Sequence, residues 1–130
     1  MNKFLSLRHF ADAGLRVPPT VFITKGELLK NAYPIFKDLE HRFGYPFVLK
    51  PNNDGSSFGV SIAAHRDEAI DAFADIFSFT NEAIVQPFIA GREMACAVLD
   101  YGFGESAFAF LPTEISPRVS RFFDYRAKYE

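Results

Sequence analysis

The chain has 130 residues, 48% of them hydrophobic, so it has the length of one ordinary domain and enough apolar side chains for a buried core. Fourteen basic and sixteen acidic residues give a formal net charge of -2, which argues against nucleic-acid or membrane binding mainly by bulk charge. Cys96 is the only cysteine, so no disulfide can form within the chain. Neither a membrane span nor a signal peptide is indicated, and we expect a cytoplasmic protein.

The first expected element is a helix that begins after Asn2, a good N-cap residue. Apolar residues recur behind it at helical spacing until Gly14. The prolines that follow block any continuation, and "VPPTVFIT" (residues 17–24) is expected to run as a short extended segment.

A second helix is expected after Thr24, whose spacing to Glu27 is that of a capping box. Pro34 should interrupt or restart this helix, because proline has no backbone N–H to donate. Gly44 then ends it.

Three strands and one helix are expected between residues 46 and 88. "PFVLK" (46–50) is too short for a helix and fits a buried strand, and "VSIAA" (60–64) fits a second one. Asp67 opens a helix with one side formed by Ile70, Phe73, Ala74 and Phe77. "AIVQPF" (83–88) is the third strand. The short loop between the first two strands favours an antiparallel pair.

The last expected elements are two extended runs, residues 93–101 and 106–112, joined by the glycine-rich "GFGE". This arrangement is typical of an antiparallel hairpin. The tail after residue 117 has no clean periodicity. The order of elements predicts the α+β class, with helices packed on an antiparallel sheet.

The segment "VLKPNNDGSSFGVSI" (residues 48–62) contains G-x-S-x-G, the pattern of a serine hydrolase elbow. An elbow requires a helix directly after the serine, whereas "FGVSIAA" has the β-branched residues of a strand. A triad would also need an acid and then a histidine downstream, yet His65 is the only histidine after Ser57 and no acid lies between them. The pattern is therefore not interpreted as a nucleophile.

Two further patterns, a dinucleotide-binding fingerprint and a set of possible metal ligands, do not fit their surroundings in the sequence. "GFGESA" matches a dinucleotide-binding fingerprint, but the residues behind it include Pro112 and predict a strand where that fold needs a helix. His9, His41, His65 and Cys96 are spread along the chain without the spacing of metal ligands. No metal site is expected from them.

The remaining interpretation of the segment is a phosphate cradle. Lys50 ends a strand as a point charge, and the loop behind it offers backbone N–H groups and hydroxyls from Gly55, Ser56, Ser57 and Gly59. The third strand then leads to Phe88, an aromatic face, and to Glu93, a carboxylate for hydroxyl groups. Together these groups suit a nucleoside triphosphate.

At this point the sequence resembles the ATP-grasp ligases, and within them the D-alanine-D-alanine ligase family. The resemblance runs in family order through "NK", "AGLRVPPTVFIT", "GYPFVLKPNNDGSSFGVS", "AIVQPFIAGREM" and "FFDYRAKYE". It implies a central ATP-grasp subdomain over residues 1–89 and the start of the C-terminal ATP-grasp subdomain over residues 90–130.

The resemblance also implies roles for individual residues. Lys3 and Lys50 would contact the nucleotide phosphates, and the loop from Gly55 through Ser56 to Ser57 would fold over them as a lid. The adenine pocket would be lined by Gln86, Phe88 and Ile89, with main-chain hydrogen bonds from Ile89. Glu93 would hold the ribose hydroxyls. Lys128 and Tyr129 would begin the loop that closes over the γ-phosphate, with Ser56 hydrogen-bonded to Tyr129 as part of the catalytic set.

Two residues depart from the family pattern: Gln86 stands where glutamate is common, and Asn2 where aspartate commonly precedes the lysine. The family's amino-terminal domain, its oxyanion arginine and its magnesium ligands have no counterpart in these 130 residues. We therefore expect the nucleotide-binding portion of the enzyme, without ligase activity alone and with Mg2+ held by residues outside it. The exposed sheet of such a portion favours self-association or a homodimer.

The reaction implied by the resemblance is ATP-dependent ligation of two D-alanine molecules through an acyl phosphate, in the synthesis of peptidoglycan precursors for the cell wall. A different ATP-grasp carboxylate-amine ligase would share the lysine, Gly-Ser-Ser and G-R-E elements. A non-catalytic nucleotide-binding or interaction module that kept the fold is the third interpretation. Nucleotide affinity separates this module from the two ligase interpretations, because an interaction module need not bind nucleotide.

Overall fold

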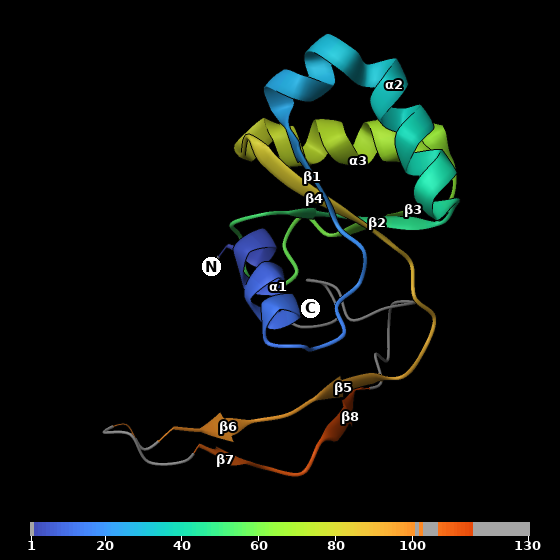
Figure 1. The fold of residues 1–130 in the computed structure, drawn as a ribbon. Coiled ribbons are helices and arrows are strands. Elements are labelled where there is room, and N and C mark those ends of the chain that lie inside the picture. Colours follow the sequence, from blue (N-terminus) through green and yellow to red (C-terminus); the bar gives the residue numbers. More distant parts are fainter. Residues whose placement is uncertain (1, 101, 103–106, 116–130) are drawn as a thin grey trace. The chain divides into compact units, whose positions relative to one another are not determined.

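The computed structural model describes residues 2–100, 102 and 107–115. Figure 1 shows the order of its elements, which fall into two units, residues 1–89 and residues 90–130. Most of the "GFGE" connection and the whole tail, including Lys128 and Tyr129, lie outside the described residues. The assignment of the two parts to the ATP-grasp subdomains stays a prediction.

The first unit is built on a four-stranded antiparallel sheet with the order β1-β4-β2-β3. Its strands are β1 (Val21–Thr24), β2 (Phe47–Pro51), β3 (Ser61–Ala63) and β4 (Glu82–Pro87). The expected antiparallel pairing of the strands on either side of the 52–60 loop is confirmed, with Val48 opposite Ile62. The segment expected only as extended becomes the edge strand β1, since it can pair with β4.

The caps of the first two helices are confirmed. Helix α1 (Lys3–Asp12) begins behind Asn2, whose side chain accepts a hydrogen bond from the Leu5 N–H. Helix α2 (Lys25–Phe43) has both bonds of the capping box between Thr24 and Glu27.

Helix α2 contains Pro34 but departs from helical geometry at Asn31, with φ -136° and ψ 39°. Pro34 cannot donate to the carbonyl of Lys30, four residues earlier, and its ring crowds that carbonyl. The predicted interruption therefore falls one turn before the proline. Helix α3 (Arg66–Phe79) is capped by His65, so Asp67 is its second residue and not its first as expected.

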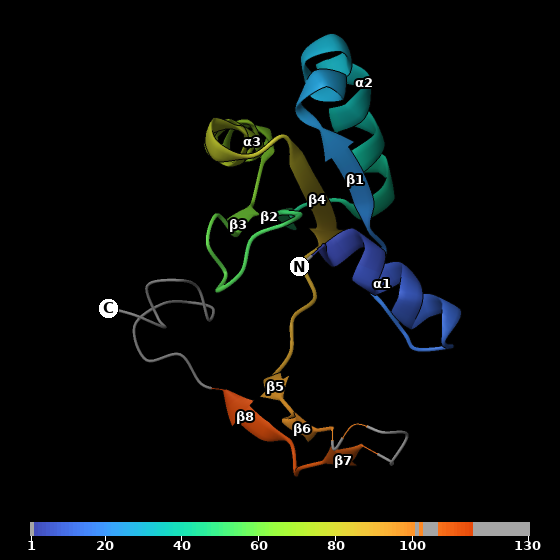
Figure 2. The same ribbon diagram turned by 90° about the vertical axis from the view of Figure 1, so that its left-hand side faces the viewer.

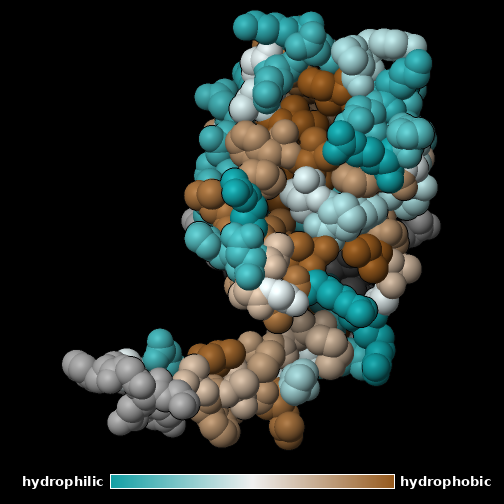
Figure 3. All heavy atoms as spheres, in the orientation of Figure 1, coloured by the Kyte–Doolittle hydropathy of each residue, from teal (hydrophilic) through white to brown (hydrophobic). Residues whose placement is uncertain are grey.

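Helices α2 and α3 cover one face of the sheet, and the core lies between them and the strands (Figures 1 and 2). From α3 the core takes Ala69, Ala72, Phe73, Ile76 and Phe77. The expectation that Ile70, Phe73, Ala74 and Phe77 share one side of α3 is confirmed, because all four line an apolar groove of about 680 Å³ between α2 and α3, where Figure 3 shows hydrophobic atoms. Within this side Phe73 and Phe77 are buried, whereas Ile70 is 46% exposed and Ala74 is also exposed.

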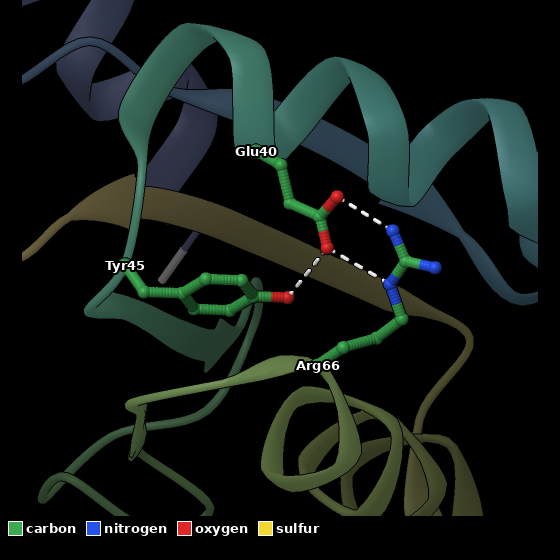
Figure 4. A network of polar contacts seen from close by, with 3 residues as sticks. All are labelled: Glu40, Tyr45 and Arg66. Carbon is green, nitrogen blue, oxygen red and sulfur yellow. Dashed lines mark hydrogen bonds and ion pairs between the residues drawn. The ribbon is translucent and has the colours of Figure 1, made fainter.

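A polar network joins α2, α3 and the segment before β2 (Figure 4). Arg66 Nε and Nη2 donate to the two carboxylate oxygens of Glu40 at 2.8 and 2.5 Å, and the Tyr45 hydroxyl donates to the same carboxylate at 3.0 Å. The Arg66 guanidinium holds the pKa of Glu40 below its usual value. The pKa of Tyr45 is raised, mainly by burial and to a smaller extent by the Glu40 carboxylate. The ring of Tyr45 stacks on Phe47 with centroids 4.6 Å apart.

The second unit contains two short antiparallel pairs. Strand β5 (Glu93–Ala95) pairs with β8 (Thr113–Ile115), and β6 (Val98–Leu99) pairs with β7 (Phe108–Ala109). The expected antiparallel arrangement is confirmed, although the first predicted run is broken into β5 and β6, the second contains only β7, and β8 begins after it. Apart from the half-buried Ile115, every described residue of this unit is exposed.

Candidate functional site

The sheet presents its predicted nucleotide residues on the face away from α2 and α3. Leu49 and Val85 lie opposite each other in the core. Because successive side chains of a strand point to opposite faces, Lys50 and Gln86 point to the other face. They are diagonal neighbours on β2 and β4, since Gln86 pairs with Val48 and not with Lys50.

Gln86 links Lys50 to the edge of the sheet. Lys50 Nζ donates to Gln86 Oε1 at 2.9 Å, and Gln86 Nε2 donates to Thr20 Oγ1 at 2.9 Å. The hydroxyl of Thr20 in turn donates to the Pro18 carbonyl at 2.9 Å. An ammonium can only donate, so Lys50 fixes which end of the Gln86 amide faces it. Glutamine thus keeps the contact with Lys50 without supplying the negative charge that a glutamate would add.

Lys3 approaches the same region from helix α1. Its Nζ donates to the carbonyl of Pro51, the last residue of β2, at 2.7 Å and to the carbonyl of Asp54 in the 52–60 loop. Burial lowers the pKa of the Lys3 ammonium, nearby Asp54 raises it in part, and the charge of Lys50 lowers it further. Two cations from distant parts of the sequence therefore lie close enough to repel each other, which favours an anionic ligand beside them.

The loop between β2 and β3 contains a strained turn. Ser56 and Ser57 both have positive φ, 52° and 58°, and the Phe58 N–H donates to the Gly55 carbonyl at 3.0 Å. Positive φ at a non-glycine residue costs about 1–3 kcal/mol, and here it occurs at two successive residues. Such strain is typical of ligand-binding segments, where the surrounding structure enforces it.

The far end of this loop is fixed by close packing. Gly59 has φ +67°, and a Cβ there would lie 2.7 Å from the ring of Phe79 and 2.9 Å from Pro51. The ring of Phe58 also packs on Phe79, with centroids 5.0 Å apart. Only glycine fits this position, so the glycine in the pattern serves the backbone and not a nucleophile.

The residues predicted to bind adenine and ribose, apart from Gln86, follow strand β4. Phe88 follows β4, its N–H donates to the Pro46 carbonyl at 3.1 Å, and its side chain is 42% exposed. Ile89 is 67% exposed. Glu93 lies in β5 of the second unit, opposite Ile115. The predicted contact between Ser56 and Tyr129 lies outside the described residues.

Three polar residues of this region were missed by the sequence analysis: Thr20, Asn52 and Glu82. Asn52 is fully buried, and its side chain bonds to α1 and to Glu82. No local pattern marks any of the three, because their partners lie 30 to 66 residues away. Over the described part of the chain, no group of three or more His, Cys, Asp or Glu side chains could hold a metal ion. None of the described helices has the length and apolar character for crossing a bilayer.

Comparison with known families gives one assignment. The family model described as "D-ala D-ala ligase C-terminus" matches residues 9–130. The chain belongs to the D-alanine-D-alanine ligase family. A curated D-alanine-D-alanine ligase from Geobacillus thermodenitrificans (strain NG80-2) is 36% identical to this family member over 130 residues, which is 100% of the chain and 35% of the relative. The chain thus spans about a third of the length of such relatives.

Solved structures of D-alanine-D-alanine ligases and a related ligase share the fold. The VanG D-Ala:D-Ser ligase from Enterococcus faecalis superposes with a TM-score of 0.79 at 32% identity, covering 100% of this chain and 36% of that one. The D-alanine-D-alanine ligase from Bacillus anthracis complexed with ATP has a TM-score of 0.59 at 29% identity, covering 73% and 29%. These similarities confirm the predicted α+β class and its ATP-grasp type.

Proposed function

We propose that this chain is the ATP-binding portion of a D-alanine-D-alanine ligase. The observation that carries the proposal is the meeting of Lys3, Lys50 and the 52–60 loop at one end of the sheet. Two ammonium groups beside a glycine- and serine-containing loop form a site for phosphate oxygens. The ATP-bound relative from Bacillus anthracis supports the choice of nucleotide.

In this proposal each part of the site has a separate task. Lys50 and Lys3 bind the phosphates, and the loop with Ser56 and Ser57 covers them. Gln86, Phe88 and Ile89 line the adenine pocket, and Glu93 accepts hydrogen bonds from the ribose hydroxyls. Lys128 and Tyr129 close over the γ-phosphate. The main contributions of a protein to phosphoryl transfer are positioning of the triphosphate for in-line attack and neutralisation of its charge.

The whole enzyme would use this site to join two D-alanine molecules. A carboxylate oxygen of the first attacks the γ-phosphorus and releases ADP, and the amine of the second displaces phosphate from the acyl phosphate. Mg2+ would be held by residues of the whole enzyme outside these 130. The proposal includes peptidoglycan precursor synthesis in the cytoplasm and self-association of the chain. The similarity to the D-Ala:D-Ser ligase keeps D-serine as a second candidate amine.

The test is calorimetric titration of the purified chain with Mg-ATP, alongside Lys50→Ala and Glu93→Ala. A hydrogen bond to a charged group is worth about 1.5–3 kcal/mol, so each substitution should weaken binding by about tenfold or more. Lys30→Ala removes an exposed lysine from α2 and serves as the charge-matched control. Circular dichroism should show that all variants remain folded.

Three outcomes separate the candidates. Saturable binding that both variants lose supports the nucleotide site. Absence of binding by the folded wild-type chain would reject ATP binding by this chain alone and favour the interaction module. Formation of a D-alanine dipeptide with consumption of ATP by the purified chain would contradict the expectation that the chain has no ligase activity alone.

A further inference from the structure

The first turn of helix α1 is capped by two asparagines, one of them remote in sequence. The side chain and carbonyl of Asn2 accept from the N–H groups of Leu5 and Ser6. The carbonyl of Asn52 accepts from the Lys3 N–H at 2.9 Å, and its Oδ1 accepts from the Phe4 N–H at 3.0 Å. The Ser6 bond is the first of the helix itself. Of the N–H groups that the helix leaves without an intrahelical partner, those of Lys3 and Phe4 are satisfied by Asn52 and that of Leu5 by Asn2.

Asn52 is itself held firmly. It is fully buried, its Nδ2 donates to Glu82 Oε2 at 2.7 Å, and its backbone N–H donates to the Glu82 carbonyl at 3.0 Å. The carboxylate of Glu82 can only accept, so it forces the amide nitrogen toward β4 and leaves the amide oxygen for α1. Glu82 thus selects the side-chain orientation in which Asn52 caps the helix.

The position of Lys3 follows from these bonds. The backbone of Lys3 is bonded to Asn52, and its ammonium reaches the carbonyls of Pro51 and Asp54 on either side of that residue along the chain. Lys50 lies two residues before Asn52. One side chain therefore connects the helix that carries one phosphate-binding cation to the strand that carries the other.

We propose that Asn52 is a positioning residue of the nucleotide site, which sets the place of Lys3 relative to Lys50 by capping α1 from the end of β2. The proposal rests on the proposed function, since Lys3 is taken to bind nucleotide phosphate. A residue with a merely structural role would support the fold without acting through Lys3. The two roles differ in whether the effects of Asn52 and Lys3 substitutions are coupled.

The experiment is a double-mutant cycle in the full chain, with Mg-ATP affinity measured by calorimetry for Asn52→Ala, Lys3→Ala and the double variant. Each single variant should bind about tenfold more weakly, as expected for losing one contact to a charged group. The double variant should bind no more weakly than Lys3→Ala alone. The proposal would be overturned if the fold-losses of Mg-ATP affinity in the two single variants multiplied in the double variant. It would also be overturned if Asn52→Ala were folded and bound Mg-ATP with wild-type affinity while Lys3→Ala bound it more weakly.

Two matched variants guard against loss of folding. Asn81→Ala removes an exposed amide beside Glu82 in the sequence and outside the 52–60 loop, and should keep wild-type affinity. Glu82→Gln keeps an oxygen that can accept from Asn52 Nδ2, so this variant should keep wild-type affinity for Mg-ATP. Glu82→Ala removes that oxygen and should weaken binding. Equal effects of Glu82→Gln and Glu82→Ala would argue against orientation of Asn52 as the cause.

A second readout needs no nucleotide. The pKa of Lys3, lowered by burial in the wild type, can be followed by NMR of its side-chain methylene groups. Asn52→Ala should release Lys3 to solvent and raise this pKa, and an unchanged pKa would overturn the proposal. If the wild-type chain binds no ATP, the proposed function fails while this measurement still decides the role of Asn52.

Discussion

The two units of the chain differ in how far their apolar side chains are buried. In residues 2–89 the sheet and two helices bury a continuous core in which Leu39, Phe47 and Leu49 are inaccessible to solvent. In the second unit Val98 is 62% and Leu111 is 89% exposed, although both belong to strongly apolar runs. Apolar sequence alone does not make a core, because a two-stranded pair has no second layer to cover it. We therefore expect the stability of the chain to reside in the first unit.

The largest expected effect comes from the centre of that core. Phe73→Ala removes a ring that is 1% exposed and should lower the free energy of unfolding by about 3–5 kcal/mol. Leu111→Ala, its counterpart in the second unit, should change it by less than about 0.5 kcal/mol. Urea denaturation followed by circular dichroism measures both. Comparable losses would show that the second unit shares in the stability of the first.

The next effect concerns the end of the 52–60 loop. Gly59→Ala places a Cβ against Phe79 and Pro51 at positive φ, so the loop must shift. The backbone conformation alone should cost about 1–2 kcal/mol, and Mg-ATP affinity should fall as well. Gly26→Ala is the control, since it meets no atom within 4 Å in α2 and should leave stability equal or up to about 1 kcal/mol higher. Equal behaviour of the two variants would refute close packing at Gly59.

A smaller effect is expected from pH. The Arg66 guanidinium lowers the pKa of Glu40 from its ordinary 4.5, so the folded state binds this proton less readily than the unfolded state. The resulting stabilisation is present above the ordinary pKa and is lost as the pH falls through the lowered value. The free energy of unfolding should therefore fall less steeply below about pH 4.5 in Glu40→Gln than in the wild type. Arg66→Gln should flatten the profile similarly, and parallel profiles for all three proteins would contradict the assignment.

The smallest expected effect is that of removing the second unit. A chain that ends after Ile89 should unfold within about 0.5 kcal/mol of the full chain and with the same dependence on urea. Failure of this shorter chain to fold would break the distinction between the units. Comparison of Mg-ATP binding by the two chains would also measure the contribution of Glu93 and its neighbours.

The helices of the first unit, its strands β2, β3 and β4 and the loop between β2 and β3 could be predicted because their signals are local, whereas β1 was expected only as an extended segment. Asn2 and the pair Thr24 and Glu27 satisfy N–H groups within four residues, so spacing alone reveals the caps. The resemblance of residues 44–61 to a ligase family likewise located Lys50 and the loop behind it. The predicted roles of Phe88, Ile89 and Glu93 stay predictions.

Tertiary structure decided the remaining features of the site. Asn52 caps a helix 48 residues away in sequence, and Gln86 bonds to Thr20 across 66 residues. The direction of each amide depends on a partner, Glu82 for Asn52 and Lys50 for Gln86, that strand pairing brings near. A residue of this kind carries no periodicity or spacing of its own. Its function follows from burial, which removes water as an alternative hydrogen-bond partner and leaves one arrangement of donors and acceptors.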